Sequence, residues 1–140
     1  MRKIASVALP PALDNLPRFI ACVSQAARGQ GLGERVGQVE LAVEEAVTNI
    51  CKYGGAPGAA EVEIVCLAGP AVLVVEISDR GRPFDMTVWP APDVKADVAQ
   101  RPIGGLGVFL IKKVTDAVEY RREGGRNVLR LTFRNRFPAI

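Results

Sequence analysis

The hydrophobic pattern of this chain changes its period partway along the sequence, and that change limits the folds it can adopt. Apolar residues recur every three to four positions through residues 12–30 and 33–53, which predicts two helices. From residue 61 onward the period is two, and it predicts strands at 61–67 and 72–79 joined as a hairpin around Ala68-Gly69-Pro70. The order of these elements indicates helices packed on a sheet.

The remaining segments complete that arrangement. Residues 3–9 alternate weakly and predict a short first strand, residues 106–116 predict a third helix, and residues 118–122 and 128–134 predict two closing strands turned by Gly124-Gly125. We therefore expect an α+β fold, a two-layer sandwich with a mixed, mostly antiparallel sheet and three helices on one face. A length of 140 residues predicts one domain over the whole chain.

Residues 82–103 differ from the rest of the sequence. They follow no sustained period, and they contain four prolines, Pro83, Pro90, Pro92 and Pro102. A connection of this length inside a compact domain is uncommon and is often functional. We expect a lid over a binding site.

The composition excludes several classes of function. The chain has no histidine, so it carries no Ser-His-Asp triad, no histidine metal cluster and no phosphohistidine. The sequence contains no run of about 18 apolar residues, so it predicts no membrane span. The N-terminus has no secretory apolar segment, which favours the cytoplasm. Cys22, Cys51 and Cys66 are odd in number and sit in apolar patterns, which indicates reduced, packed thiols.

The arginines of the C-terminal third, together with a net charge of +3, raise the possibility of a nucleic-acid partner. They alternate with apolar residues along predicted strands, however, and exposed aromatic residues that could stack on bases are not interleaved with them. We expect a solvated sheet face and no direct contact with nucleic acid.

Glu45 and Asn49 lie four residues apart on the second predicted helix, at the border of its apolar stripe. Asparagine is a poor residue in the middle of a helix, so its place needs a reason. It is either a polar boundary residue bonded to a nearby loop or an oxygen ligand of Mg²⁺. In the second case Glu45, one turn away, could deprotonate an attacking hydroxyl.

Two glycine motifs follow. Asp79-Arg80-Gly81 ends an apolar strand, where the carboxylate could accept a hydrogen bond from an exocyclic amine such as that of adenine, although the same tripeptide is also a common turn. Gly104-Gly105-Leu106-Gly107 precedes the third helix, where free N–H groups attract phosphate, although it could also be a hinge. In this order, with a lid between them, the motifs suggest a site for Mg·ATP.

The same motifs resemble those of a known family. Glu45-Ala-Val-Thr-Asn49, Asp79-Arg-Gly81 and Gly104-Gly-Leu-Gly107 are similar to the three boxes of the Bergerat (GHKL) ATP-binding fold, and within it the chain resembles the bacterial anti-sigma factor serine/threonine kinases, the RsbW-like group. The resemblance covers nearly the whole chain.

That resemblance implies a role for each residue. Glu45 would be the base that activates the substrate hydroxyl, Asn49 the Mg²⁺ ligand, and Asp79 the adenine anchor with Gly81 beside it. The phosphate loop would be Gly104, Gly105, Leu106 and Gly107. Asn127 replaces a threonine that supports the adenine-bound water in the family. Lys52-Tyr53 replaces the usual histidine or arginine after the first box, which puts a phosphate or lid contact there in doubt.

The resemblance also implies partners. Such proteins bind a sigma factor and use ATP and Mg²⁺ to phosphorylate a STAS-type anti-sigma-factor antagonist on serine or threonine, generally as homodimers. The alternative is a nucleotide-binding switch without phosphotransfer, and the presence of Glu45 favours the kinase. A histidine-kinase domain would need an acceptor histidine on another protein, and an RNA-binding α+β domain rests on the basic balance alone.

Overall fold

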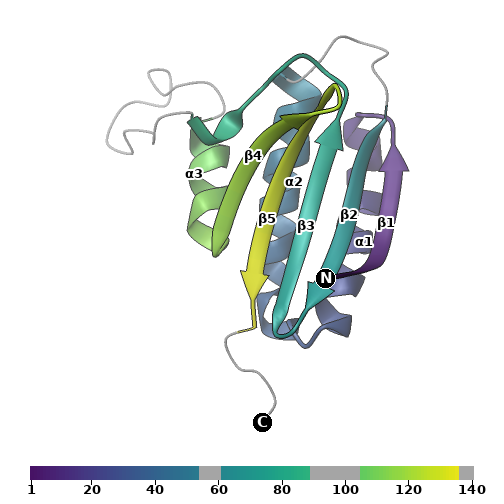
Figure 1. Cartoon of the computed structure of the whole chain (residues 1–140), viewed down its shortest axis with the longest axis vertical. Helices are drawn as coiled ribbons and strands as arrows, with labels where there is room; N and C mark the ends of the chain where they lie inside the picture. Colours follow the sequence, from purple (N-terminus) through teal and green to yellow (C-terminus); the bar gives the residue numbers. More distant parts are fainter. Residues whose placement is uncertain (54–60, 89–104, 136–140) are drawn as a thin grey trace.

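A twisted sheet forms one layer of the molecule (Figure 1). The computed structural model describes residues 1–53, 61–88 and 105–135. Its strands are paired in the order β1-β2-β3-β5-β4, and all four pairings are antiparallel. Their bounds are β1 (Arg2–Leu9), β2 (Val62–Gly69), β3 (Val72–Asp79), β4 (Ala117–Glu123) and β5 (Arg126–Arg134).

The second layer consists of helices on one face of this sheet (Figure 1). They are α1 (Leu16–Gly29), α2 (Val36–Tyr53) and α3 (Gly105–Val114), and short 3₁₀ turns occur at η1 (Leu13–Asn15), η2 (Gly33–Arg35) and η3 (Met86–Val88). The expected α+β sandwich with helices on one face is confirmed. Within the described part of the chain, no helix is both long and apolar enough to cross a membrane.

The two tight hairpins show how local chemistry sets the register. Strand β2 continues through Gly69, which pairs with Val72, so the turn consists of Pro70 and Ala71 and lies slightly later than expected. Between β4 and β5, Gly124 and Gly125 have φ angles of +58° and +77°. Two consecutive positive φ angles match the right-handed twist of a hairpin, and glycine adopts them without strain.

The core lies between the two layers. Alternate residues of β2, including Val62, Ile64 and Cys66, are fully buried against the helices. The apolar stripe of α2 meets them, and its Val43 and Val47 are also fully buried. The apolar residues that recur with periods of two and 3.6 in the sequence therefore form the two faces that pack together.

The opposite face of the sheet is charged. Arg126 forms an ion pair with Glu63 at 3.3 Å, and Arg130 forms one with Glu76 at 3.2 Å. These arginines come from the alternating C-terminal strands, as predicted. Glu76 lies on β3, next to β5, and Glu63 lies on β2, one strand further away. These acidic partners balance much of the local charge.

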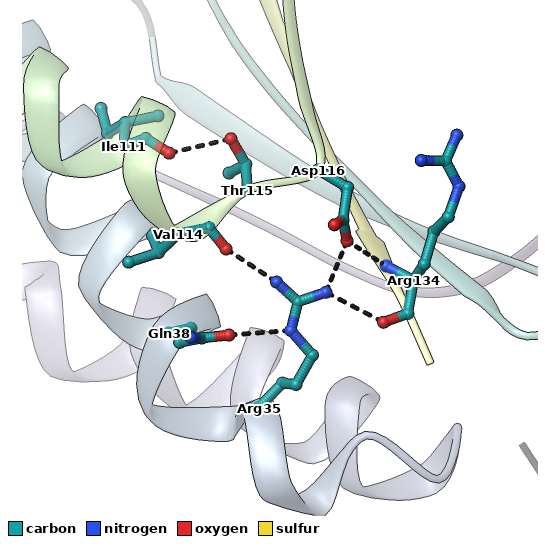
Figure 2. Close-up of polar contacts among 7 residues, drawn as sticks. All are labelled: Arg35, Gln38, Ile111, Val114, Thr115, Asp116 and Arg134. Atoms are coloured by element: carbon teal, nitrogen blue, oxygen red, sulfur yellow. Dashed lines mark hydrogen bonds and ion pairs between the residues drawn. The ribbon is translucent and has the colours of Figure 1, made fainter. Parts of the chain in front are cut away.

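Arg35 forms a buried polar cluster at the start of α2 (Figure 2). Its guanidinium forms an ion pair with Asp116 and donates to the backbone oxygens of Val114 and Arg134, both at 2.9 Å, and to the side chain of Gln38 at 2.8 Å. It also lies 5.6 Å from the centre of the Phe133 ring.

This cluster joins four parts of the chain. The carbonyl of Val114 is at the end of α3, where helix carbonyls lack partners within the helix. Asp116 precedes β4 and also accepts from the backbone N–H of Arg134 at the end of β5, at 2.7 Å. Arg35 therefore fixes the start of α2 against the end of α3 and the sheet. The patterns of the sequence do not single out this residue.

We predict that Asp116→Asn lowers the free energy of unfolding by about 1.5–3 kcal/mol, because Arg35 would keep its buried charge without a counter-charge. Urea unfolding monitored by circular dichroism measures the change. Arg121→Gln, which removes the ion pairs of the exposed Arg121 with Glu76 and Glu123, is the matched control and should cost less than about 1 kcal/mol. Equal effects of the two substitutions would contradict the special role of the Arg35 cluster.

Candidate functional site

Helix α2 places Glu45 and Asn49 one turn apart on its side facing α3. Asn49 is 4% exposed, whereas Glu45 is half-buried and Glu44 next to it is exposed. The predicted position at the rim of the core is therefore right for Glu45, and Asn49 lies deeper. A carboxylate at this depth is still reachable from outside the core.

The first turn of α3 comes very close to this pair. A β-carbon placed on Gly107 would lie 2.7 Å from Oε2 of Glu45 and 3.4 Å from Nδ2 of Asn49. Glycine leaves this approach open, whereas a larger residue would push the end of the Glu45 side chain aside. The contact brings together two sequence motifs about 60 residues apart. Gly105 and Leu106 belong to the same turn of α3, and Gly104 lies outside the described residues.

The carboxamide of Asn49 has an unsatisfied atom. Among the residues that the structure describes, its Nδ2 is the buried side-chain polar atom without a hydrogen-bond partner. Leaving a buried donor unpaired costs about 1–3 kcal/mol, so such an atom indicates a bound group. The donor suits a phosphate oxygen, and a helix N-terminus beside it suits the same anion.

The same residues fit a magnesium ion only in part. Asparagine binds Mg²⁺ through its oxygen, and Mg²⁺ commonly takes one or two protein ligands together with phosphate oxygens and waters. Within the described ranges no group of three or more acidic, cysteine or histidine side chains is placed to hold a metal. Any Mg²⁺ here would therefore depend on a bound phosphate for most of its ligands.

The environment of Glu45 changes its acidity. Burial raises the pKa of this carboxyl, the negative charge of Glu44 raises it further, and Lys52 lowers it. A carboxylate with a raised pKa is a stronger base when it is ionised, which suits proton abstraction.

A second group of predicted residues lies where β3 ends beside the start of β5. Asp79 pairs in register with Asn127, and the two side chains are 6% and 4% exposed. Oδ1 of Asp79 accepts from the backbone N–H of Gly81 at 2.9 Å and from Nδ2 of Asn127 at 3.2 Å. Asp79 therefore both closes the Asp79-Arg80-Gly81 turn and forms a polar pair with Asn127.

A small cavity adjoins this pair. Its polar residues are Asp79, Asn127 and Tyr120, and its apolar walls are Ile50, Ile77, Phe84, Met86 and Leu129. The space measures about 10 Å³, which holds about one water molecule. A purine base would therefore enter only after an apolar wall moves outward.

The segment that supplies two of these walls is the start of the predicted lid. Residues 82–88 are held by several bonds: Arg82 donates to the carbonyl of Tyr53 at the end of α2, and Lys112 of α3 donates to the carbonyl of Thr87 at 2.8 Å. Met86 is 4% exposed. Residues 89–103, the rest of the predicted lid, lie outside the described residues.

The fold thus gathers the described site residues into two groups along α2. Glu45, Asn49 and Gly107 form one, and Asp79, Gly81 and Asn127 form the other; Ile50, next to Asn49, lines the cavity of the second. Sequence reasoning missed Tyr120. The period of two along β4 puts it on the same face as Val118, a signal that could have revealed it.

Comparisons with known proteins agree with this geometry. The sequence profile of the histidine kinase-like ATPase domain family matches residues 9–133. A protein named serine-protein kinase RsbW from Listeria monocytogenes serovar 1/2a is 32% identical over 109 residues, which are 73% of this chain and 68% of that protein. A protein of the same name from Bacillus thuringiensis is 29% identical over 96 residues, which are 65% of this chain and 59% of that protein.

One solved structure has a similar fold. It contains the RsbU and RsbW domains of Rv1364c from Mycobacterium tuberculosis, and it superposes with a TM-score of 0.62 at 14% sequence identity. The match covers 96% of this chain and 32% of that longer one. At this identity the likeness concerns the fold alone.

We predict that Glu45→Gln is more stable than the wild type at about pH 7.5 and equally stable near pH 4. The raised pKa means that the folded chain holds this proton more tightly than the unfolded chain, so stability is lost as pH rises above the ordinary glutamate value of about 4.3. Urea unfolding at both pH values tests this, with the exposed Glu61→Gln as control. A wild type that is the more stable of the two at pH 7.5 would contradict it.

Proposed function

This chain belongs to the histidine kinase-like ATPase family, and we propose that within it the protein is a serine/threonine protein kinase that uses Mg·ATP. We further propose that it acts in the cytoplasm as an anti-sigma factor, which sequesters a sigma factor and phosphorylates a STAS-type antagonist. The relatives named serine-protein kinase RsbW support the assignment of the reaction.

One observation supports this function most directly. The Glu45 carboxylate and the unpartnered Nδ2 of buried Asn49 converge on Gly107 in the first turn of α3. A donor without a partner, a helix N-terminus and a glycine that leaves room between them form a place for a phosphate group. The carboxylate beside it can act on a hydroxyl that attacks this phosphate.

In the proposed reaction Glu45 is the general base. Its carboxylate accepts the proton of the serine or threonine hydroxyl as the hydroxyl oxygen forms a bond to the transferred phosphorus. At the same time the bond between this phosphorus and the oxygen of the leaving nucleoside diphosphate breaks. When bound, Mg·ATP supplies the phosphoryl group and the cation that balances its charge. The raised pKa of Glu45 favours the proton transfer.

The other residues bind and orient. Asn49 would hold the metal through its oxygen, and the backbone of Gly104, Gly105, Leu106 and Gly107 would contact the phosphates. Asp79, with Gly81 and Asn127 beside it, would anchor the base. Outward movement of the Phe84 and Met86 side chains, which line the cavity, would admit that base. These residues begin the lid that we propose at about residues 82–103 of a single domain.

We also propose a homodimer. Strand β1 is an edge strand that pairs with β2 on one side, and in the described part of the chain Leu13 on η1, close to it in sequence, is 52% exposed. An open strand edge and an exposed large apolar side chain each favour association, and in a homodimer the interface is self-complementary and two-fold.

We predict that Glu45→Ala keeps nucleotide affinity nearly intact and lowers phosphotransfer by about 10²- to 10⁴-fold, the usual contribution of a positioned general base. Asn49→Ala should lose Mg²⁺-dependent nucleotide binding and phosphotransfer together. A radiolabel transfer assay on a STAS-type antagonist, run beside calorimetric titration with Mg·ATP, measures both quantities.

Gly107→Ala is a sharper variant for the same assays. Its β-carbon would displace the Glu45 carboxylate, since the two would be 2.7 Å apart, while alanine in a helix is more favourable than glycine by up to about 1 kcal/mol. We expect a fold of unchanged or higher stability with about 10²-fold slower transfer.

Full phosphotransfer activity of the Glu45→Ala variant would reject the base assignment and favour a nucleotide-binding switch without phosphotransfer.

For the homodimer we predict a dimer in sedimentation velocity at micromolar concentration, and a shift toward monomer in Leu13→Asp, which places a charge on the exposed apolar position. The exposed Glu61→Gln is the control and should keep the wild-type distribution. A wild type that stays monomeric at every concentration contradicts the proposal.

A further inference from the structure

Two of the three cysteines meet between the helix layer and the sheet. Cys66 is fully buried on the face of β2 that carries Ile64 and Ala68, and this face packs against the helices. Cys22 lies half-buried on α1, which runs behind β1 and β2 (Figure 1). The two thiols share a hydrogen bond, and both are free. The fold therefore brings together two sulfur atoms that are far apart in the sequence.

Small side chains surround this pair of cysteines. Ala5 of the edge strand β1 pairs in register with Cys66 and lies beside it. Ala26, one helical turn after Cys22 on the same side of α1, is 6% exposed. Cys22 itself packs against the hydrophobic core. A small residue at each of these places leaves room for the two thiols to meet between α1 and β2.

The shared hydrogen bond makes the two thiols chemically unequal. It lowers the pKa of Cys22 to about 7, although burial opposes this change. The same hydrogen bond and burial raise the pKa of Cys66. Near neutral pH, Cys22 is therefore the thiol that ionises, and the thiolate is the form that reacts with oxidants. Cys66 stays protonated and donates to it.

Cys51 on α2 provides an internal comparison. It is half-buried, as Cys22 is, but burial raises the pKa of its thiol. Exposure alone would give Cys22 and Cys51 similar reactivity. A thiol that is protonated at neutral pH reacts slowly, so the neighbouring Cys66 is what distinguishes Cys22.

We propose that Cys22 is a site of oxidation by hydroperoxides and that Cys66 is the thiol that resolves the product into a disulfide. With hydrogen peroxide, the Cys22 sulfur attacks one oxygen, the O–O bond breaks, and a sulfenic acid and hydroxide form. The Cys66 sulfur then attacks the Cys22 sulfur, the S–O bond breaks, and the hydroxyl group leaves with the Cys66 proton as water. The two sulfurs lose two electrons, which reduce one peroxide.

The resulting bond joins α1 to β2. It closes a loop that contains the whole of α2, the helix that carries Glu45 and Asn49. Disulfides of cytosolic proteins are usually transient and redox-sensing, and cellular thiols reduce them again. The free thiols of the structure are then the resting state, in agreement with the reduced, packed cysteines that the sequence predicts.

The test treats the reduced full chain with a small excess of hydrogen peroxide at neutral pH. Free thiols are then alkylated in denaturant, and the peptides are mapped by mass spectrometry. We expect the folded wild type to lose two of its three alkylatable thiols and to become lighter by two hydrogen atoms. The map should show Cys22 linked to Cys66 and Cys51 alkylated, and dithiothreitol should restore both lost thiols.

Cys51→Ala is the matched control and should form the same disulfide at the wild-type rate. Cys66→Ala should stop at the sulfenic acid of Cys22, which dimedone traps, and Cys22→Ala should leave Cys66 reduced. Circular dichroism verifies that each variant folds.

The wild-type map alone can overturn the proposal. It does so if Cys51 is oxidised as readily as Cys22, if Cys22 is oxidised further while Cys66 keeps a free thiol, or if all three thiols survive the treatment. These outcomes do not depend on whether the variants fold.

Discussion

The guanidinium of Arg35 is the buried charge on which the packing of the helices depends. A buried cation is tolerated only when it is paired and its donors are satisfied, and here the acceptors come from α2, the end of α3, the residue before β4 and the end of β5. These segments must therefore meet at one point. Because the start of α2 and the end of α3 are fixed there, the direction of both helices is set, and Asn49 comes to lie near Gly107 at the other end of α3.

The two ends of the molecule differ in how their buried polar groups are satisfied. Around Arg35 and around Asn127, the described donors find acceptors inside the protein, and such networks hold a structure in one arrangement. Asn49 is buried to a similar extent, yet its Nδ2 has no described partner. The difference separates a residue that supports the fold from one that is prepared for a ligand.

Helix α2 also explains how one element serves two ends of a ligand. Asn49 points toward the first turn of α3, and the next residue, Ile50, lines the cavity beside Asp79. A nucleotide has a polar phosphate end and a flat, largely apolar base, and the two faces of this helix offer a surface of each kind. Half-burial of Glu45 at the boundary raises its pKa without closing it off from a protein substrate.

The layers and the motifs can be predicted from the sequence alone. The periods of 3.6 and two placed the helices and strands, because side chains that share a face must share a period. The motifs predicted Glu45, Asn49, Asp79 and Gly107 as site residues, and the fold brings the first two to Gly107.

Contacts between residues far apart in the chain arise from the tertiary fold and are not predicted by local sequence. Arg35 and Asp116 are separated by 81 positions, and Tyr120 reaches Asp79 through Asn127. No local pattern marks Arg35 as a residue that becomes buried, and the period of two along β4 places Tyr120 on the face of Val118 without showing that its hydroxyl bonds to an amide. Their roles arise when the sheet register and the helix packing place their polar atoms within hydrogen-bond distance and away from water.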